Sequence, residues 1–214
     1  MGTLADIRDL VREDLRDPDD AIWSDAQLER HVEHAVFDYS MVNPQEKTAT
    51  IQHDTDARTV DLSTITNRIR IVAVEFPVGE YPQRYVPFSH WGDTLTMDLA
   101  AAPSGQADVK IYYHAEHTIN GTTTFPALHN NVIATGAAGY ACLELTADTA
   151  NKVNVGGENA WGRYLELAAG RSKSFHQQLR AIAEAYANRM KTSRLYTPAS
   201  GVRFSTETTD PGPV

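Results

Sequence analysis

The sequence predicts a mixed α+β fold, in which a helical bundle carries an inserted antiparallel β region and ends in an extended tail. Three observations support this. Apolar residues recur at helical spacing near both ends of the chain, alternate with polar residues across the middle, and show neither pattern in the last segment. The expected divisions are 1–44 and 118–192 for the ring-forming bundle, 45–117 for the β insertion and 193–214 for the tail.

The first two helices are predicted over residues 3–17 and 25–42. Ser24 and Gln27 have the spacing of a capping box, in which the two residues satisfy each other's backbone N–H groups at the start of a helix. Asn43-Pro44 ends the second helix, because proline disfavours helical geometry in the residue before it.

From about residue 47 to residue 117 the hydrophobic period changes to two, as expected for strands. The run Ile69–Phe76 is rich in β-branched residues, and Val109–Tyr113 alternates. Tyr85–Phe88 contains a proline, so it is at best an edge strand. Several short strands separated by turn signals favour a small antiparallel sandwich or barrel.

Two more helices follow, over residues 126–151 and 158–192. The former is crowded with Gly and Ala, which indicates close packing against a neighbour, since glycine is a poor helix former. The latter keeps an apolar stripe throughout and would span roughly 50 Å. The tail is rich in Thr, Ser, Pro and Gly.

Composition narrows the class of protein. The formal net charge of −9 and the pI of about 5.3 argue against a basic DNA-binding surface, although an acidic ring would let DNA slide through it without sticking. No apolar run reaches the length of a membrane-spanning helix, so we expect no membrane partner. The single cysteine, Cys142, cannot form an intramolecular disulfide, which fits folding in a reducing cytoplasm.

Charge is distributed unevenly along the chain. Acidic side chains outnumber basic ones in residues 1–40, and the reverse holds in residues 158–194. Opposite charges could steer neighbouring copies into a head-to-tail contact. An equally good interpretation is that the two faces pair within one subunit. The candidates for charge pairing between subunits are Asp9, Glu13, Asp17, Arg171, Arg180 and Arg189.

No motif for catalysis or cofactor binding occurs in the sequence: nucleophile elbow, phosphate-binding loop and dinucleotide fingerprint are all missing. His31 and His34 lie three residues apart, and His114, Glu116 and His117 cluster after the last predicted strand. Neither set has the spacing of a known zinc motif. We therefore predict no catalytic residues, no metal, no cofactor and no enzymatic activity.

The order of elements resembles that of head–tail connector, or adaptor, proteins of tailed bacteriophages over nearly the whole chain. The resemblance rests on three short motifs and on their order along the chain. An acidic helix follows the second motif, and the third motif ends the β segment. These motifs are Leu4-x-x-Ile7-x-x-Leu10-Val11-x-x-Asp14-Leu15-x-Asp17, Trp23-Ser24-Asp25-x-x-Leu28 and Val109-x-Ile111-Tyr112-Tyr113-x-Ala115-x-His117.

This resemblance implies a structural protein of the virion neck, assembled in the host cytoplasm, that forms a twelve-membered ring on the portal protein. DNA would pass through the ring without specific binding. The tail would contact the portal, and the β insertion would face the downstream neck or tail protein. By this analogy the candidate portal contacts are Tyr196, Val202, Arg203 and Phe204, and the candidate distal contacts are Tyr81, Tyr85 and Trp91.

Other functions are compatible with the same sequence. The chain could be another neck protein, such as a stopper or tail-completion protein. Alternatively, the β insertion could bind carbohydrate or a receptor through Trp91 and Tyr85. An enzyme is the third possibility, and mutation of His114 or His117 would test it.

Overall fold

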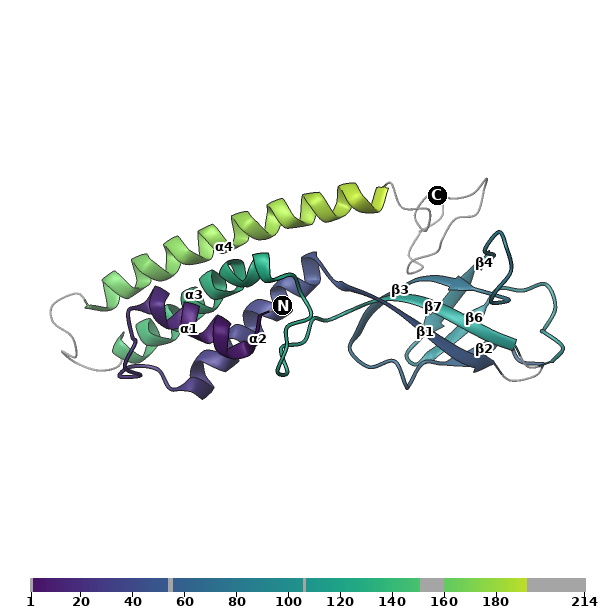
Figure 1. Ribbon diagram of the computed structural model, residues 1–214, viewed down its shortest axis with the longest axis horizontal. Coiled ribbons are helices and arrows are strands. Elements are labelled where there is room, and N and C mark those ends of the chain that lie inside the picture. Colours follow the sequence, from purple (N-terminus) through teal and green to yellow (C-terminus); the bar gives the residue numbers. More distant parts are fainter. Residues whose placement is uncertain (1, 54–55, 106, 151–159, 192–214) are drawn as a thin grey trace, which may run out of the picture. The chain divides into compact units, whose positions relative to one another are not determined.

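The computed structural model describes residues 2–53, 56–105, 107–150 and 160–191 of the 214-residue chain. Within these residues the protein has four α-helices and two antiparallel sheets that do not close into a barrel (Figure 1). The prediction of a mixed α+β fold is therefore confirmed. Contacts divide the chain into two compact units. Of the described residues, the helical unit comprises 2–43, 117–150 and 160–186, and the β unit comprises 44–53, 56–105, 107–116 and 187–191.

Helices α1 (Leu4–Leu15) and α2 (Asp25–Val42) both begin with a capping box. Ser24 accepts a hydrogen bond from the backbone of Gln27, whose side chain accepts one from the Ser24 backbone, as the sequence predicts. Helix α1 ends two residues earlier than predicted, because Arg16 adopts a left-handed conformation with φ of 58° and caps the helix.

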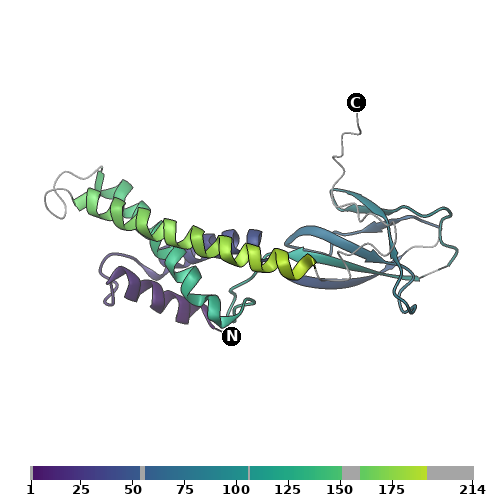
Figure 2. The same ribbon diagram turned by 90° about the horizontal axis from the view of Figure 1, so that it is seen from above.

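Helix α3 (Asn130–Ala150) follows a 3₁₀ turn, η1 (Ala127–His129), and α4 spans Ala160–Lys191. Helix α4 passes close to α3 (Figure 1), and the second view shows the two helices crossing at an angle (Figure 2). A Cβ atom added at Gly136 would lie 2.8 Å from the Phe175 ring, and one at Gly139 would lie 3.4 Å from the backbone of Ser172. These two glycines therefore serve the close approach of α4.

One apolar core joins all four helices of the helical unit. Helices α1 and α2 contribute Ile7, Val11, Leu28, Val32 and Tyr39 to it. Phe125 and the small residues of α3 lie across from them, and Phe175 and Leu179 are the contribution of α4. Because only a few residues of this long helix enter the core, much of its described surface stays exposed.

The β unit contains seven described strands in two sheets. The first has the order β1-β7-β3-β4, and the second has the order β2-β6-β5. The strands are β1 (Gln45–His53), β2 (Thr59–Asp61), β3 (Arg68–Glu75), β4 (Tyr85–Val86), β5 (Phe88–Trp91), β6 (Thr94–Met97) and β7 (Ala107–Ala115).

The segment Tyr85–Phe88, predicted to be at best an edge strand, leaves one sheet and enters the other. Strand β4 is at the edge of the first sheet, β5 is at the edge of the second, and Pro87 lies between them. Proline has no backbone N–H to donate to a ladder, so it fits the change of sheet. Both sheets contribute to one core, which includes Ile71, Val74, Val109, Leu95 and Met97.

Candidate interaction surfaces

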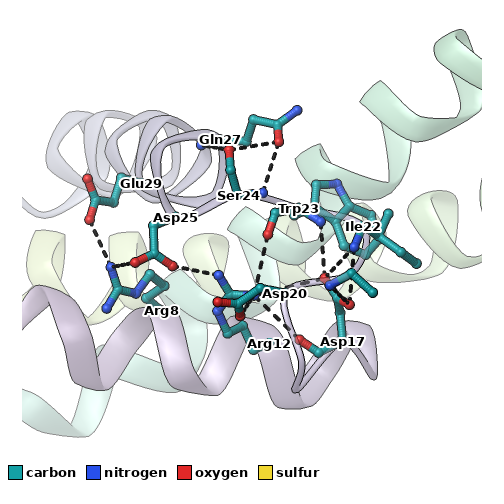
Figure 3. A network of polar contacts seen from close by, with 11 residues as sticks. Arg8, Arg12, Asp17, Asp20, Ile22, Trp23, Ser24, Asp25, Gln27 and Glu29 are labelled. Carbon is teal, nitrogen blue, oxygen red and sulfur yellow. Dashed lines mark hydrogen bonds and ion pairs between the residues drawn. The ribbon is translucent and has the colours of Figure 1, made fainter.

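The connection between α1 and α2 is organised around the carboxylate of Asp17, whose residue is only 3% exposed. Its oxygens accept hydrogen bonds from the backbone N–H groups of Ala21, Ile22 and Trp23 at 2.9, 3.1 and 3.0 Å (Figure 3). Burial alone would raise the pKa of Asp17, but these N–H groups and the nearby Arg12 guanidinium together hold it below its usual value.

Arg12 ties this loop to both helices. Its buried guanidinium lies 2.5 Å from carboxylate oxygens of Asp20 and Asp25, and it donates to the carbonyl of Trp23 (Figure 3). Arg8 extends the network by pairing with Asp25 at 2.6 Å. A buried charge with this many partners fixes the loop conformation, because breaking any one partner leaves polar groups unsatisfied.

Some of the residues predicted to pair between subunits have partners in their own chain. Asp17 is occupied by the loop just described, and Arg171 pairs with Asp14 at 2.5 Å. Arg189 lies 2.9 Å from Glu46. Of these contacts, the Arg171–Asp14 pair joins the acidic and the basic segment within one subunit, as the alternative interpretation expects. The exposed candidates of the helical unit are Asp9, Glu13 and Arg180.

An open groove of about 600 Å³ lies along α4 and reaches α3 at Thr135. Leu167 and Gly170 form its apolar part, and Leu167 is 43% exposed. The remaining lining residues are polar or charged: Arg163, Glu166, Arg171 and Ser174. The groove therefore combines a hollow at a glycine with an exposed leucine and charged side chains, a combination that suits a protein partner.

Among the described aromatic residues, the two most exposed are Tyr81 at 95% and Trp91 at 90%, and they lie near opposite ends of β3. Tyr81 lies in the loop after Glu75, where β3 ends. Trp91 precedes the turn at Gly92, and Arg68, where β3 begins, donates to the Gly92 carbonyl at 2.7 Å. Eight residues of strand separate these ends by about 23 Å, so the two side chains do not form one surface.

Tyr85, the third aromatic candidate of the β unit, is half-buried and packs against other side chains. Its ring meets Tyr112 edge-on at 5.8 Å between centroids. Tyr112 in turn donates a hydrogen bond to the buried carboxylate of Glu75 at 2.6 Å. Tyr85 is thus part of the sheet's packing near Glu75, whereas Trp91 lies near the other end of β3.

The four histidines noted in the sequence contact other side chains or backbone groups. His31 lies 2.6 Å from Glu144, and His34 stacks on Tyr140. His114 accepts from Arg70 at 3.1 Å, and burial with that cation lowers its pKa to about 4. His117 contacts Thr124 and the carbonyl of Asn43. In the described part of the chain, no three His, Cys, Asp or Glu side chains are arranged to hold a metal.

The four candidate portal contacts, Tyr196, Val202, Arg203 and Phe204, lie outside the described residues. Among the helices that are described, none has the length and apolar character needed to cross a membrane. A comparison with models of known protein families found no match, and a comparison with curated protein sequences found none either.

The sequence interpretation missed three residues of the helical unit: Ile22, Leu167 and Gly170. Ile22 is 47% exposed in the loop that Asp17 organises (Figure 3). The sequence does hold one signal for Ile22, because this isoleucine lies in a loop shortly after several acidic residues. Leu167 and Gly170 could not be distinguished from core positions by their spacing alone, because the face that α4 buries depends on its partners.

Proposed function

We propose that this chain is a non-enzymatic adaptor subunit of a tailed-phage neck. In this role it forms a homo-oligomeric ring, twelve-membered by analogy, that docks on the portal protein and connects the DNA-filled head to the tail. Its place is the head–tail interface of the virion. DNA passes through the ring, and the acidic net charge of −9 disfavours adhesion of phosphates to the wall.

The observation that supports this role best is the separation of two cores within one chain. Helices from both ends of the sequence share one core, and the strands between them share another. We assign the four helices to a bundle that builds the ring and the two sheets to a sandwich-like module that faces the downstream neck or tail protein. A chain with two independent cores can contact two different partners without either contact disturbing the other.

Tyr81 is the strongest candidate for the downstream contact. It is almost fully exposed in the loop after β3, at the end of the sheet opposite Gln45 and Ala115, the first residue of β1 and the last of β7. An aromatic side chain left in water at a loop tip has little packing role in its own unit and is a frequent anchor in protein interfaces. The portal contact is assigned to the tail residues Tyr196, Val202, Arg203 and Phe204.

The test is size-exclusion chromatography with light scattering, using the cognate portal, the full-length chain and a truncation that ends at Thr192. We expect a stoichiometric ring complex with the full-length chain and none with the truncation. A Phe204→Ala variant should weaken the complex, whereas Ser205→Ala is a matched control in the same segment. If the full-length chain does not bind the portal, the adaptor role is wrong.

A carbohydrate- or receptor-binding module is the second candidate, and the 90% exposure of Trp91 is the observation in its favour. Tryptophan faces stack readily on the apolar faces of sugar rings, as they do on other flat surfaces. Glycan-array binding that Trp91→Ala abolishes, together with no binding to the portal, would favour this function over the adaptor.

A further inference from the structure

The described glycines inside α3 and α4 are of two kinds. At Gly136 and Gly139 a neighbouring helix approaches so closely that it leaves little room for a side chain, which explains the glycine within the chain. Gly170 lies inside α4 and lines the groove, yet a Cβ atom added there would meet nothing within 4 Å. Glycine in a helix interior is unfavourable relative to alanine, so this hollow has a cost that no contact of the described residues offsets.

Ile22 contrasts with Gly170, because it presents a large side chain where Gly170 leaves open space. It is a large apolar side chain, 47% exposed, on a loop whose backbone is fixed by the Asp17 carboxylate and by Arg12. Figure 3 shows it at the margin of this polar network. A rigid loop loses little conformational freedom when it binds, so an exposed isoleucine there is well placed to act as an anchor.

The charges around the two features are complementary. The segment from Asp17 to Trp23 carries three acidic residues and no basic one. Two of the three already pair with Arg12, which leaves Asp19 exposed without an ion pair among the described residues. The groove has Arg163 and Arg171 against a single acid, Glu166. Arg171 already pairs with Asp14, which leaves Arg163 as the exposed cation for an incoming acidic loop.

We infer that a second copy of this chain occupies the groove, with Ile22 of one subunit inserted beside Gly170 and Leu167 of the next. The two surfaces share no residue, so the contact is head-to-tail and can close a ring. It gives the proposed ring a specific lateral interface and in that sense rests on the proposed function. It needs no portal, however, so its failure would leave portal binding untouched.

The first test is sedimentation velocity over a dilution series with the full-length chain and single variants. Gly170→Leu fills the hollow with a good helix former, and Ile22→Asp removes the anchor. Each should weaken self-association about tenfold or more. Gly162→Leu is the matched control, because Gly162 also lies in α4 with open space but does not line the groove. Self-association of Gly170→Leu equal to that of the unmodified chain would overturn the inference.

The second test traps the contact even if it is weak. Ile22→Cys and Gly170→Cys are prepared as separate full-length proteins, mixed and mildly oxidised. We expect a cross-linked dimer of one chain of each kind, and none from Ile22→Cys mixed with Gly162→Cys. Cys142 is fully buried and should not react. A chain that stays monomeric at every concentration and gives no mixed dimer contradicts the proposed contact.

Discussion

The α1–α2 connection and the outer face of α4 belong to the same unit but differ in how their residues are satisfied. In the connection, Asp17 and Arg12 each hold several partners within the chain, so the loop is complete by itself. On α4, Leu167 and Gly170 border an open groove. Asp17 and Arg12 therefore maintain the fold, whereas no contact among the described residues accounts for the glycine at position 170.

The largest effect on stability should come from Asp17. Asp17→Ala removes three backbone hydrogen bonds and takes a carboxylate away from the buried Arg12 guanidinium. Breaking one side of such a network costs about 3–5 kcal/mol of unfolding free energy, measured by urea denaturation.

The matched control is Asp19→Ala, which lies in the same loop but is exposed. We expect it to change the free energy of unfolding by less than about 0.5 kcal/mol. Equal losses from the two variants would mean that the loop is not held by Asp17.

Replacing glycine by alanine should change the stability of the protein in opposite directions at Gly136 and at Gly170. Gly136→Ala places a Cβ atom 2.8 Å from the Phe175 ring and should destabilise the protein by about 1–3 kcal/mol. Gly170→Ala meets no neighbour and should stabilise it by up to about 1 kcal/mol, because alanine is the better helix former. Thermal unfolding of both variants gives the comparison. A loss at Gly170 would show that the groove is filled within the subunit.

Acidic pH should also destabilise the protein, through protonation of His114. The folded-state pKa of His114 is lowered to about 4 from its ordinary value of 6.5, so the unfolded chain binds a proton more readily than the folded one between these values. His114 therefore favours the folded state fully above pH 6.5, and this contribution falls as the pH drops toward 4. We expect the free energy of unfolding, measured by urea denaturation, to fall by roughly 3 kcal/mol across this window.

His114→Gln retains a hydrogen-bond acceptor for Arg70 and should flatten the pH dependence of stability in this window. Asp17 acts at lower pH. Its folded pKa lies below its usual value of 3.8, so its contribution is present above that value and is lost only in stronger acid. A pH profile unchanged by His114→Gln would contradict the assignment.

The sequence allowed the fold class to be predicted because each element carries a local signal. The capping box at Ser24 and the alternation of Val109–Tyr113 require only neighbouring residues to be recognised. The candidate surfaces depend on distant partners. Asp17 was predicted to pair between subunits because its charge is visible in the sequence, whereas the backbone of Ala21–Trp23 turning back onto it is not. Tyr81 and Trp91 were both predicted to contact one distal partner, because their places near opposite ends of β3 cannot be read from the sequence.

The smallest effect on stability should come from the most exposed aromatic residues. Tyr81→Ala should leave the free energy of unfolding within about 0.5 kcal/mol, because the side chain is 95% exposed. If Tyr81 anchors the downstream neck or tail protein, the same variant should weaken that complex by about 2 kcal/mol or more in a titration. Trp91→Ala is the control at the opposite end of β3 and should spare this complex. Equal weakening by both variants would mean that the partner spans the sheet instead of meeting the loop after β3.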